Sequence, residues 1–166
     1  MRVLGIDPGT ATTGYGVVEE TRAGGLRALA YGAVTTPATQ SMPERLQAIY
    51  RALVGLAQEW QPDHSAVEEL YFSVNVRTAM SVGQARGVAI LALADAGLSI
   101  AEYSPLSVKQ ALTGYGGADK RQMQEMVRML LNLPEIPRPD DAADALAVAV
   151  CHIHSAAMLA LEERDT

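Results

Sequence analysis

Two short apolar runs in this chain of 166 residues each end in an acidic residue, which limits the folds the chain can adopt. Residues 3–6 are followed by Asp7 and then by a Pro-Gly turn. Residues 64–67 are followed by Glu68. Short apolar runs bounded by turn residues are typical of buried strands, so both acids are expected where a strand leaves the core. Taken singly, Asp7 is equally well explained as a turn aspartate and Glu68 as a surface residue.

A second pair of acids, Asp141 and Asp144, lies at the start of an apolar helical segment near the C-terminus. Residues three apart share one face of a helix, about 4.5 Å apart along its axis. The alanines among them allow this end of the helix to approach a sheet closely. A buried cluster of like charges needs divalent cations to be tolerated. The four acids together therefore predict a metal-dependent phosphoryl-transfer site, in which two ions about 3.5–4 Å apart activate water and stabilise the leaving oxygen.

Composition places the chain in a broad class. A hydrophobic content of 49% over 166 residues predicts one globular domain with a substantial core. A single cysteine excludes an intramolecular disulfide, and neither a leader segment nor a membrane span is recognisable, so a cytoplasmic protein without membrane contact is expected. The net charge is −6, but residues 71–128 carry +2, and this middle third is where a phosphate backbone could bind.

The periodicity of apolar residues predicts a mixed α/β fold. Strands are expected at residues 2–7, 15–19 and 29–35, forming an antiparallel meander, and a helix from residue 43 to residue 60. A short strand then ends at Glu68, a loop covers residues 69–75, and further strands and helices alternate. The later elements are a helix at 75–96, a strand at 99–103, a helix starting at Ser104-Pro105 and a glycine-rich loop at 113–118. Apolar residues within 123–131 then mark an amphipathic helix, and Asp141 and Asp144 open the last helix. A three-stranded meander, followed by strands that alternate with helices, predicts a sheet that is antiparallel at first and then parallel, flanked by helices.

Five motifs occur in an order that resembles the RuvC family of Holliday junction resolvases. They are Ile6-Asp7-Pro8-Gly9-Thr10 with Gly14-Tyr15-Gly16, Ala66-Val67-Glu68, the segment 83–89, Val108-Lys109-Gln110, and the segment 141–147. The resemblance implies an RNase H-like nuclease domain, which we place at residues 1–158, with a polar tail at 159–166. It also implies a homodimer that nicks opposing strands of a four-way DNA junction and leaves 5′-phosphate and 3′-hydroxyl ends. Two Mg²⁺ or Mn²⁺ ions per site, and the branch-migration proteins RuvA and RuvB as partners, are implied as well.

The resemblance assigns roles to individual residues. Asp7, Glu68, Asp141 and Asp144 match the catalytic, metal-binding carboxylates. Lys109 and Lys120 match lysines that serve catalysis and DNA contact, and a cation at Lys109 could neutralise charge on the scissile phosphate. Tyr71 matches an aromatic wedge near the junction centre, where stacking is worth about 1–3 kcal/mol per base. The remaining residues proposed to contact DNA are Phe72, for which core burial is the alternative, and Arg121. Arg77 and Arg86 are weaker candidates, because either could instead form an ion pair on the helix surface.

Several residues and motifs are open to more than one interpretation from the sequence. Asp140 precedes Asp141 and is expected to cap the last helix, although it could substitute for Asp141 as a ligand. Gly83 and Gly87 lie one helical turn apart and fit either internal packing or the dimer contact that the resemblance implies. The start of the chain also resembles the first phosphate loop of actin-like ATPases, but no second loop follows. We also consider an RNase H-like nuclease that acts on another nucleic acid, and a DNA-binding module with an inactive site.

Overall fold

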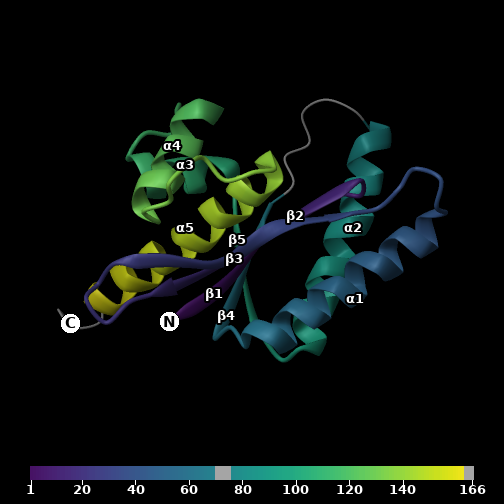
Figure 1. Ribbon diagram of the computed structural model, residues 1–166, viewed down its shortest axis with the longest axis horizontal. Coiled ribbons are helices and arrows are strands. Elements are labelled where there is room, and N and C mark those ends of the chain that lie inside the picture. Colours follow the sequence, from purple (N-terminus) through teal and green to yellow (C-terminus); the bar gives the residue numbers. More distant parts are fainter. Residues whose placement is uncertain (70–75, 163–166) are drawn as a thin grey trace.

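The computed structural model describes residues 1–69 and 76–162, which form a five-stranded mixed sheet with helices on both faces (Figure 1). The strand order is β3-β2-β1-β4-β5. Strands β1 (Arg2–Asp7), β2 (Thr12–Glu20) and β3 (Leu26–Thr35) are antiparallel neighbours. Strand β4 (His64–Glu68) runs parallel to β1, and β5 (Ser99–Tyr103) runs parallel to β4. The expected α/β class, antiparallel first and then parallel, is confirmed.

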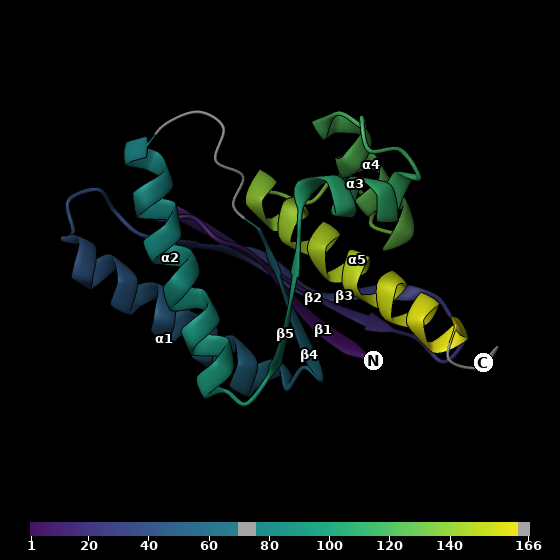
Figure 2. The same ribbon diagram turned by 180° about the vertical axis from the view of Figure 1, so that it is seen from behind.

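The helices divide into two layers. Figure 2 shows α1 (Met42–Trp60) and α2 (Val76–Asp95) on one face of the sheet, and α5 (Asp140–Glu162) on the other. Helices α3 (Pro105–Thr113) and α4 (Lys120–Leu130) pack against α5 on the side away from the sheet. None of the helices within residues 1–69 and 76–162 has the length and apolar character needed to cross a bilayer.

Side chains of the central strands alternate between the two layers, as expected for extended chain. In β1, Leu4 and Ile6 pack in the core beneath α1 and α2, whereas Val3 belongs to the core beneath α5. In β4, Val67 faces α1 and α2 and Ala66 faces α5. The next acidic residue of each strand, Asp7 or Glu68, therefore projects toward α5. Because Ile6 pairs with Val67 in parallel register, the two acids emerge side by side at the carboxyl edge of the sheet.

Glycines in β1 and β2 allow α5 to lie almost directly on the strands. A Cβ atom built on Gly14 would lie 2.0 Å from the Asp141 carbonyl oxygen, and one built on Gly5 would lie 2.1 Å from that of Ala145. Gly14 also pairs with Asp7 across the β1–β2 ladder. The helix end that carries Asp141 is thus placed directly above the end of β1.

Element boundaries follow the sequence closely, with a few differences. Helix α4 begins at Lys120, three residues before the apolar segment that predicted it. Strand β5 has the predicted bounds, and Ser104 caps α3 by accepting a hydrogen bond from the Ser107 amide at 3.1 Å. Strands β2 and β3 begin three residues earlier than predicted, at Thr12 and Leu26, because each extends the ladder of the other. Helix α5 continues to Glu162, so it includes the first residues of the segment expected to be a tail.

Candidate active site

Asp7 and Glu68 form the centre of an acidic cluster at the carboxyl edge of the sheet. The two side chains share a hydrogen bond, and the pKa of Asp7 is raised to about 8. Burial is the main cause, followed by the charges of Glu68 and Asp144, the hydrogen bond itself and the charge of Asp141. The Asp7–Glu68 pair therefore tends to keep one proton in the metal-free protein, and acids from β4 and α5 act together on Asp7.

Two lysines face this cluster from α3 and α4. Glu68, Asp144, Lys109 and Lys120 line one cleft of about 210 Å³. Burial raises the pKa of Glu68, while its hydrogen bond with Asp7 and the charges of Lys120 and Lys109 act in the opposite direction. Burial also raises the pKa of Asp144, with Lys120 opposing it. The cleft thus combines acids that favour added positive charge with cations that can face a phosphate.

Asp140 and Asp141 occupy different positions at the start of α5. Asp141 contributes to the charge around Asp7, and its backbone lies against Gly14. Asp140 is the first residue of the helix, and its side chain contacts Arg138, Gln124 and Lys120 instead of capping the helix. The structure therefore gives Asp140 a different set of partners from Asp141.

The donor set of the cluster fits a divalent cation of the Mg²⁺ or Mn²⁺ type. In residues 1–69 and 76–162, no three acidic, histidine or cysteine side chains are grouped closely enough to coordinate a metal as they stand. All four acids nevertheless offer the hard oxygen ligands that these ions prefer. The raised pKa values of Asp7, Glu68 and Asp144 indicate a site that is short of positive charge.

The structure describes the side chains of some residues predicted to contact DNA and not of others. Arg121 is exposed beside Lys120 in the first turn of α4. The backbone of Arg77 lies in α2, but its side chain, like Tyr71 and Phe72, lies outside the described residues. Arg86 pairs with Glu102 and donates a hydrogen bond to the Glu68 carbonyl oxygen at 3.4 Å. The alternative of an ion pair therefore holds for Arg86, which also supports the end of β4.

Two further polar features were not predicted. Gln124 is buried one helical turn after Lys120, and a polar residue between the buried Met123 and Val127 is the signal that could have revealed it. His152 contacts His64 at 2.8 Å and the Tyr103 hydroxyl at 2.9 Å. These contacts give His152 a structural position in a partly buried network that joins β4, β5 and α5.

Comparisons with known proteins identify a family. The family model described as crossover junction endodeoxyribonuclease RuvC matches residues 3–152. A protein of that name from Chloroflexus aggregans is 62% identical over 160 residues, covering 96% of each chain. A relative from Roseiflexus is 60% identical over 158 residues, covering 95% of this chain and 94% of its own length.

Solved structures extend the comparison to the fold. The Thermus thermophilus RuvC structure in complex with a Holliday junction substrate is 39% identical, with a TM-score of 0.90 and coverage of 95% of this chain and 96% of its own. The yeast mitochondrial Holliday junction resolvase, at 16% identity and a TM-score of 0.70, covers 95% of this chain and 81% of its own and shares the fold alone. The sheet order, the paired strand-end acids and these matches lead to one conclusion: the chain belongs to the RuvC family of crossover junction endodeoxyribonucleases, with an RNase H-like fold.

Proposed function

We propose that this RuvC-family endonuclease nicks two opposing strands of a four-way DNA junction, using Asp7, Glu68, Asp141 and Asp144 as its metal ligands. The supporting observation is the cleft in which Glu68 and Asp144 lie opposite Lys109 and Lys120. Membership of the family implies dependence on a divalent metal. Two Mg²⁺ or Mn²⁺ ions, when bound, would supply an activated water and charge stabilisation at the scissile phosphate.

The chain's own residues account for the rest of the chemistry. Glu68 and Asp7 must lose their shared proton to act as ligands, and the positive charge of the bound cations favours that loss. Lys109, on the wall of the cleft, is placed to stabilise the negative charge that develops on the phosphate. In-line attack by water leaves a 5′-phosphate and a 3′-hydroxyl, ends that a ligase can rejoin.

DNA contacts are assigned to the surface around the cleft. Lys120 and Arg121 in the first turn of α4 would bind the backbone of the incoming strand, as would Arg77. Tyr71 and Phe72 would stack on bases at the junction centre. The overall negative charge of −6 does not favour long-range attraction to DNA, so binding must depend on this local basic surface.

Asp7→Asn is the decisive test of the site. It replaces a carboxyl ligand with a neutral amide and adds no negative charge, so junction binding should be kept while cleavage falls by at least about 10³-fold, because several kcal/mol of transition-state stabilisation depend on the ligand set. Cleavage should be measured on a synthetic four-way junction, a linear duplex and an RNA/DNA hybrid, each with Mg²⁺, Mn²⁺ or chelator.

The control is Asp63→Asn, which makes the same substitution at the opposite end of the sheet, where Asp63 accepts a hydrogen bond from the Arg2 amide. Its cleavage rate per folded molecule should equal that of the wild type. Wild-type cleavage by Asp7→Asn would contradict the assigned site. Efficient cleavage of the hybrid, with the junction left intact, would favour another RNase H-like nuclease activity.

We also propose that the protein acts as a homodimer through α2. One stripe of this helix is exposed and largely uncharged: Met80, Gln84, Gly87 and Leu91, at helical spacing, with Met80 68% and Leu91 52% exposed. A Cβ atom built on Gly87 meets nothing within 4 Å, so internal packing does not explain this glycine. A two-fold dimer would give one active site for each of the two equivalent strands.

Gly87→Leu tests this interface. The larger side chain fits the isolated subunit but would prevent close approach of a partner helix. A clash of at least about 1.4 kcal/mol would raise the Kd of the dimer by about tenfold or more, so sedimentation should shift from dimer to monomer. Paired nicking of a junction should fall with it. Gly55→Ala, on the exposed side of α1, should leave the sedimentation profile unchanged. A Gly87→Leu protein that remains dimeric would place the interface elsewhere.

Three broader assignments complete the proposal. We place the nuclease domain at residues 1–158 and the polar tail at 159–166. RuvA and RuvB are the proposed protein partners, and a cytoplasmic location is proposed from the composition. Each rests on the family resemblance or on sequence composition.

A further inference from the structure

Asp140 lies next to the proposed metal ligands, yet its carboxylate faces a lysine. Its Oδ2 atom is 3.2 Å from Lys120 Nζ. The same Nζ atom is 3.5 Å from Asp144 Oδ2. Lys120 is therefore shared between two carboxylates, and only one of them belongs to the proposed metal site.

The other oxygen of Asp140 is fixed from two directions. Its Oδ1 atom accepts hydrogen bonds from Arg138 Nη1 at 2.7 Å and from Gln124 Nε2 at 3.1 Å. Gln124 is only 8% exposed and lies one turn beyond Lys120 on α4, so the same helix supplies the lysine and one of these donors. The two bonds orient the carboxylate so that Oδ2 points at the lysine.

Lys120 and a metal ion would compete for Asp144. The ammonium and a bound divalent cation would repel each other if both contacted the same carboxylate. The ammonium must therefore leave Asp144 when that residue coordinates a cation. Lys120 also occupies the first position of α4, where the helix dipole disfavours a positive charge, so it needs a carboxylate partner after the exchange.

On the basis of the proposed function, we propose that Asp140 is a positioning residue. It draws Lys120 away from Asp144 and holds the lysine ammonium at the mouth of the cleft. The movement is short because both contacts already exist at 3.2 and 3.5 Å. Asp144 is thereby freed for the metal, and Lys120 stays where it can meet a phosphate. Without the Asp140 charge, Lys120 remains on Asp144 and competes with the ion.

Asp140→Asn tests this role with a readout that does not depend on cleavage. Mn²⁺ binding to the full-length protein, measured by calorimetry without DNA, should weaken by about tenfold, within the range of 10–100-fold found for residues that support metal ligands. The Mg²⁺ concentration for half-maximal junction cleavage should rise by a similar factor, while the rate at saturating Mg²⁺ changes little. Asp140→Glu, which keeps the charge, should restore most of the affinity.

A double-mutant cycle separates positioning from simple loss of charge. Lys120→Met removes the competing ammonium, so Asp140→Asn should have little further effect on Mn²⁺ binding in that background. An equal weakening in both backgrounds would show that Asp140 acts through its charge alone and would overturn the proposal. So would unchanged Mn²⁺ binding in the single variant.

Glu125→Gln is the matched control, because Glu125 also lies on α4 but pairs with Arg128 within the helix. It should leave Mn²⁺ binding unchanged, and a comparable weakening would again indicate a general charge effect. Failure of the wild-type protein to cut a junction would contradict the proposed function itself. Normal cleavage by the wild type, with an Asp140→Asn variant that behaves identically, would contradict only the role of Asp140.

Discussion

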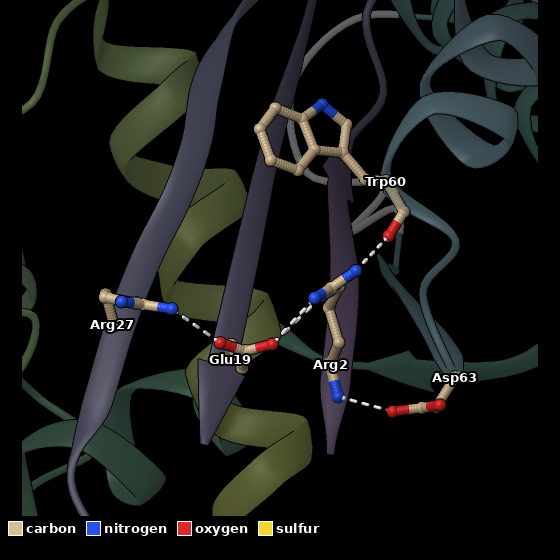
Figure 3. Close-up of polar contacts among 5 residues, drawn as sticks. All are labelled: Arg2, Glu19, Arg27, Trp60 and Asp63. Carbon is tan, nitrogen blue, oxygen red and sulfur yellow. Dashed lines mark hydrogen bonds and ion pairs between the residues drawn. The ribbon is translucent and has the colours of Figure 1, made fainter. Parts of the chain in front are cut away.

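Acidic side chains are paired with basic ones at the amino end of β1, whereas they lie beside other acids at its carboxyl end. At the amino end, the Arg2 guanidinium bonds to Glu19 on β2 at 2.8 Å and to the Trp60 carbonyl oxygen at 2.6 Å (Figure 3). Glu19 also pairs with Arg27 on β3 at 2.9 Å, and the Asp63 carboxylate accepts from the Arg2 amide at 2.7 Å. Glu19 and Asp63 thus each have a donor, and the contacts connect three strands with the end of α1.

At the carboxyl end, acids face acids. Asp7 and Glu68 share a proton, and Asp144 and Asp141 add to the unfavourable field around Asp7. Arg2 and Arg27 hold the pKa of Glu19 below its usual value, whereas burial and neighbouring charges raise that of Asp7 to about 8. One end of the strand thus contributes to stability, while the other keeps a charge imbalance that bound cations would relieve.

Gly14→Ala should disrupt the carboxyl end with the largest effect. A Cβ atom at this position would lie 2.0 Å from the Asp141 carbonyl oxygen, so the start of α5 must shift away from β2. Overpacking of this kind costs about 1–3 kcal/mol, and a displacement of about 1 Å in a catalytic group can lower a rate by about 100-fold. Denaturant unfolding and junction cleavage by the folded variant measure the two effects separately.

Gly55→Ala is the control for this substitution. Nothing lies within 4 Å of a Cβ atom on Gly55, which is exposed in α1. Alanine there should stabilise the protein by about 0.5–1 kcal/mol and leave cleavage unchanged. Wild-type activity and stability in Gly14→Ala would mean that close packing of α5 does not position the site.

The sequence was sufficient to predict the layers of the fold and the location of the acids. Apolar runs and helical periodicity are local signals, so β1, β4, β5 and the start of α3 were expected where the structure has them. Asp7 and Glu68 could be assigned to one sheet edge because both follow buried strands.

Contacts between distant segments could not be predicted in the same way. Local helical geometry kept both Asp140 and Asp141 as candidates, whereas Gln124 and Arg138 orient Asp140 only after α4 has packed beside α5. The extra length of β2 and β3 likewise depends on mutual pairing. Three-dimensional packing, which brings these segments together, decides such details.

The smallest expected effects concern stability as a function of pH, where the two ends should respond with opposite sign. In the metal-free protein the raised pKa of Asp7 favours its protonated form in the folded state. The contribution of protonated Asp7 to the free energy of unfolding is therefore fully present below about pH 4 and is lost as pH rises toward about 8. Because Asn cannot ionise, the Asp7→Asn variant should not lose this stability as pH rises. Its Tm should exceed that of the wild type by about 2–8 °C at pH 8 and nearly equal it at pH 4.

Glu19→Gln at the paired end should show the reverse. Because Arg2 and Arg27 lower the pKa of Glu19, its contribution is present above its unfolded pKa and is lost as pH falls below about 4.5. The variant should be less stable than the wild type at pH 8, by a smaller margin because these pairs are exposed, and should approach it near pH 3. Thermal unfolding in chelator across pH 3–8.5 tests both variants. If Asp7→Asn instead lowered Tm at pH 8, the acid cluster would contribute to stability as Glu19 does, and the contrast between the two ends of β1 would be lost.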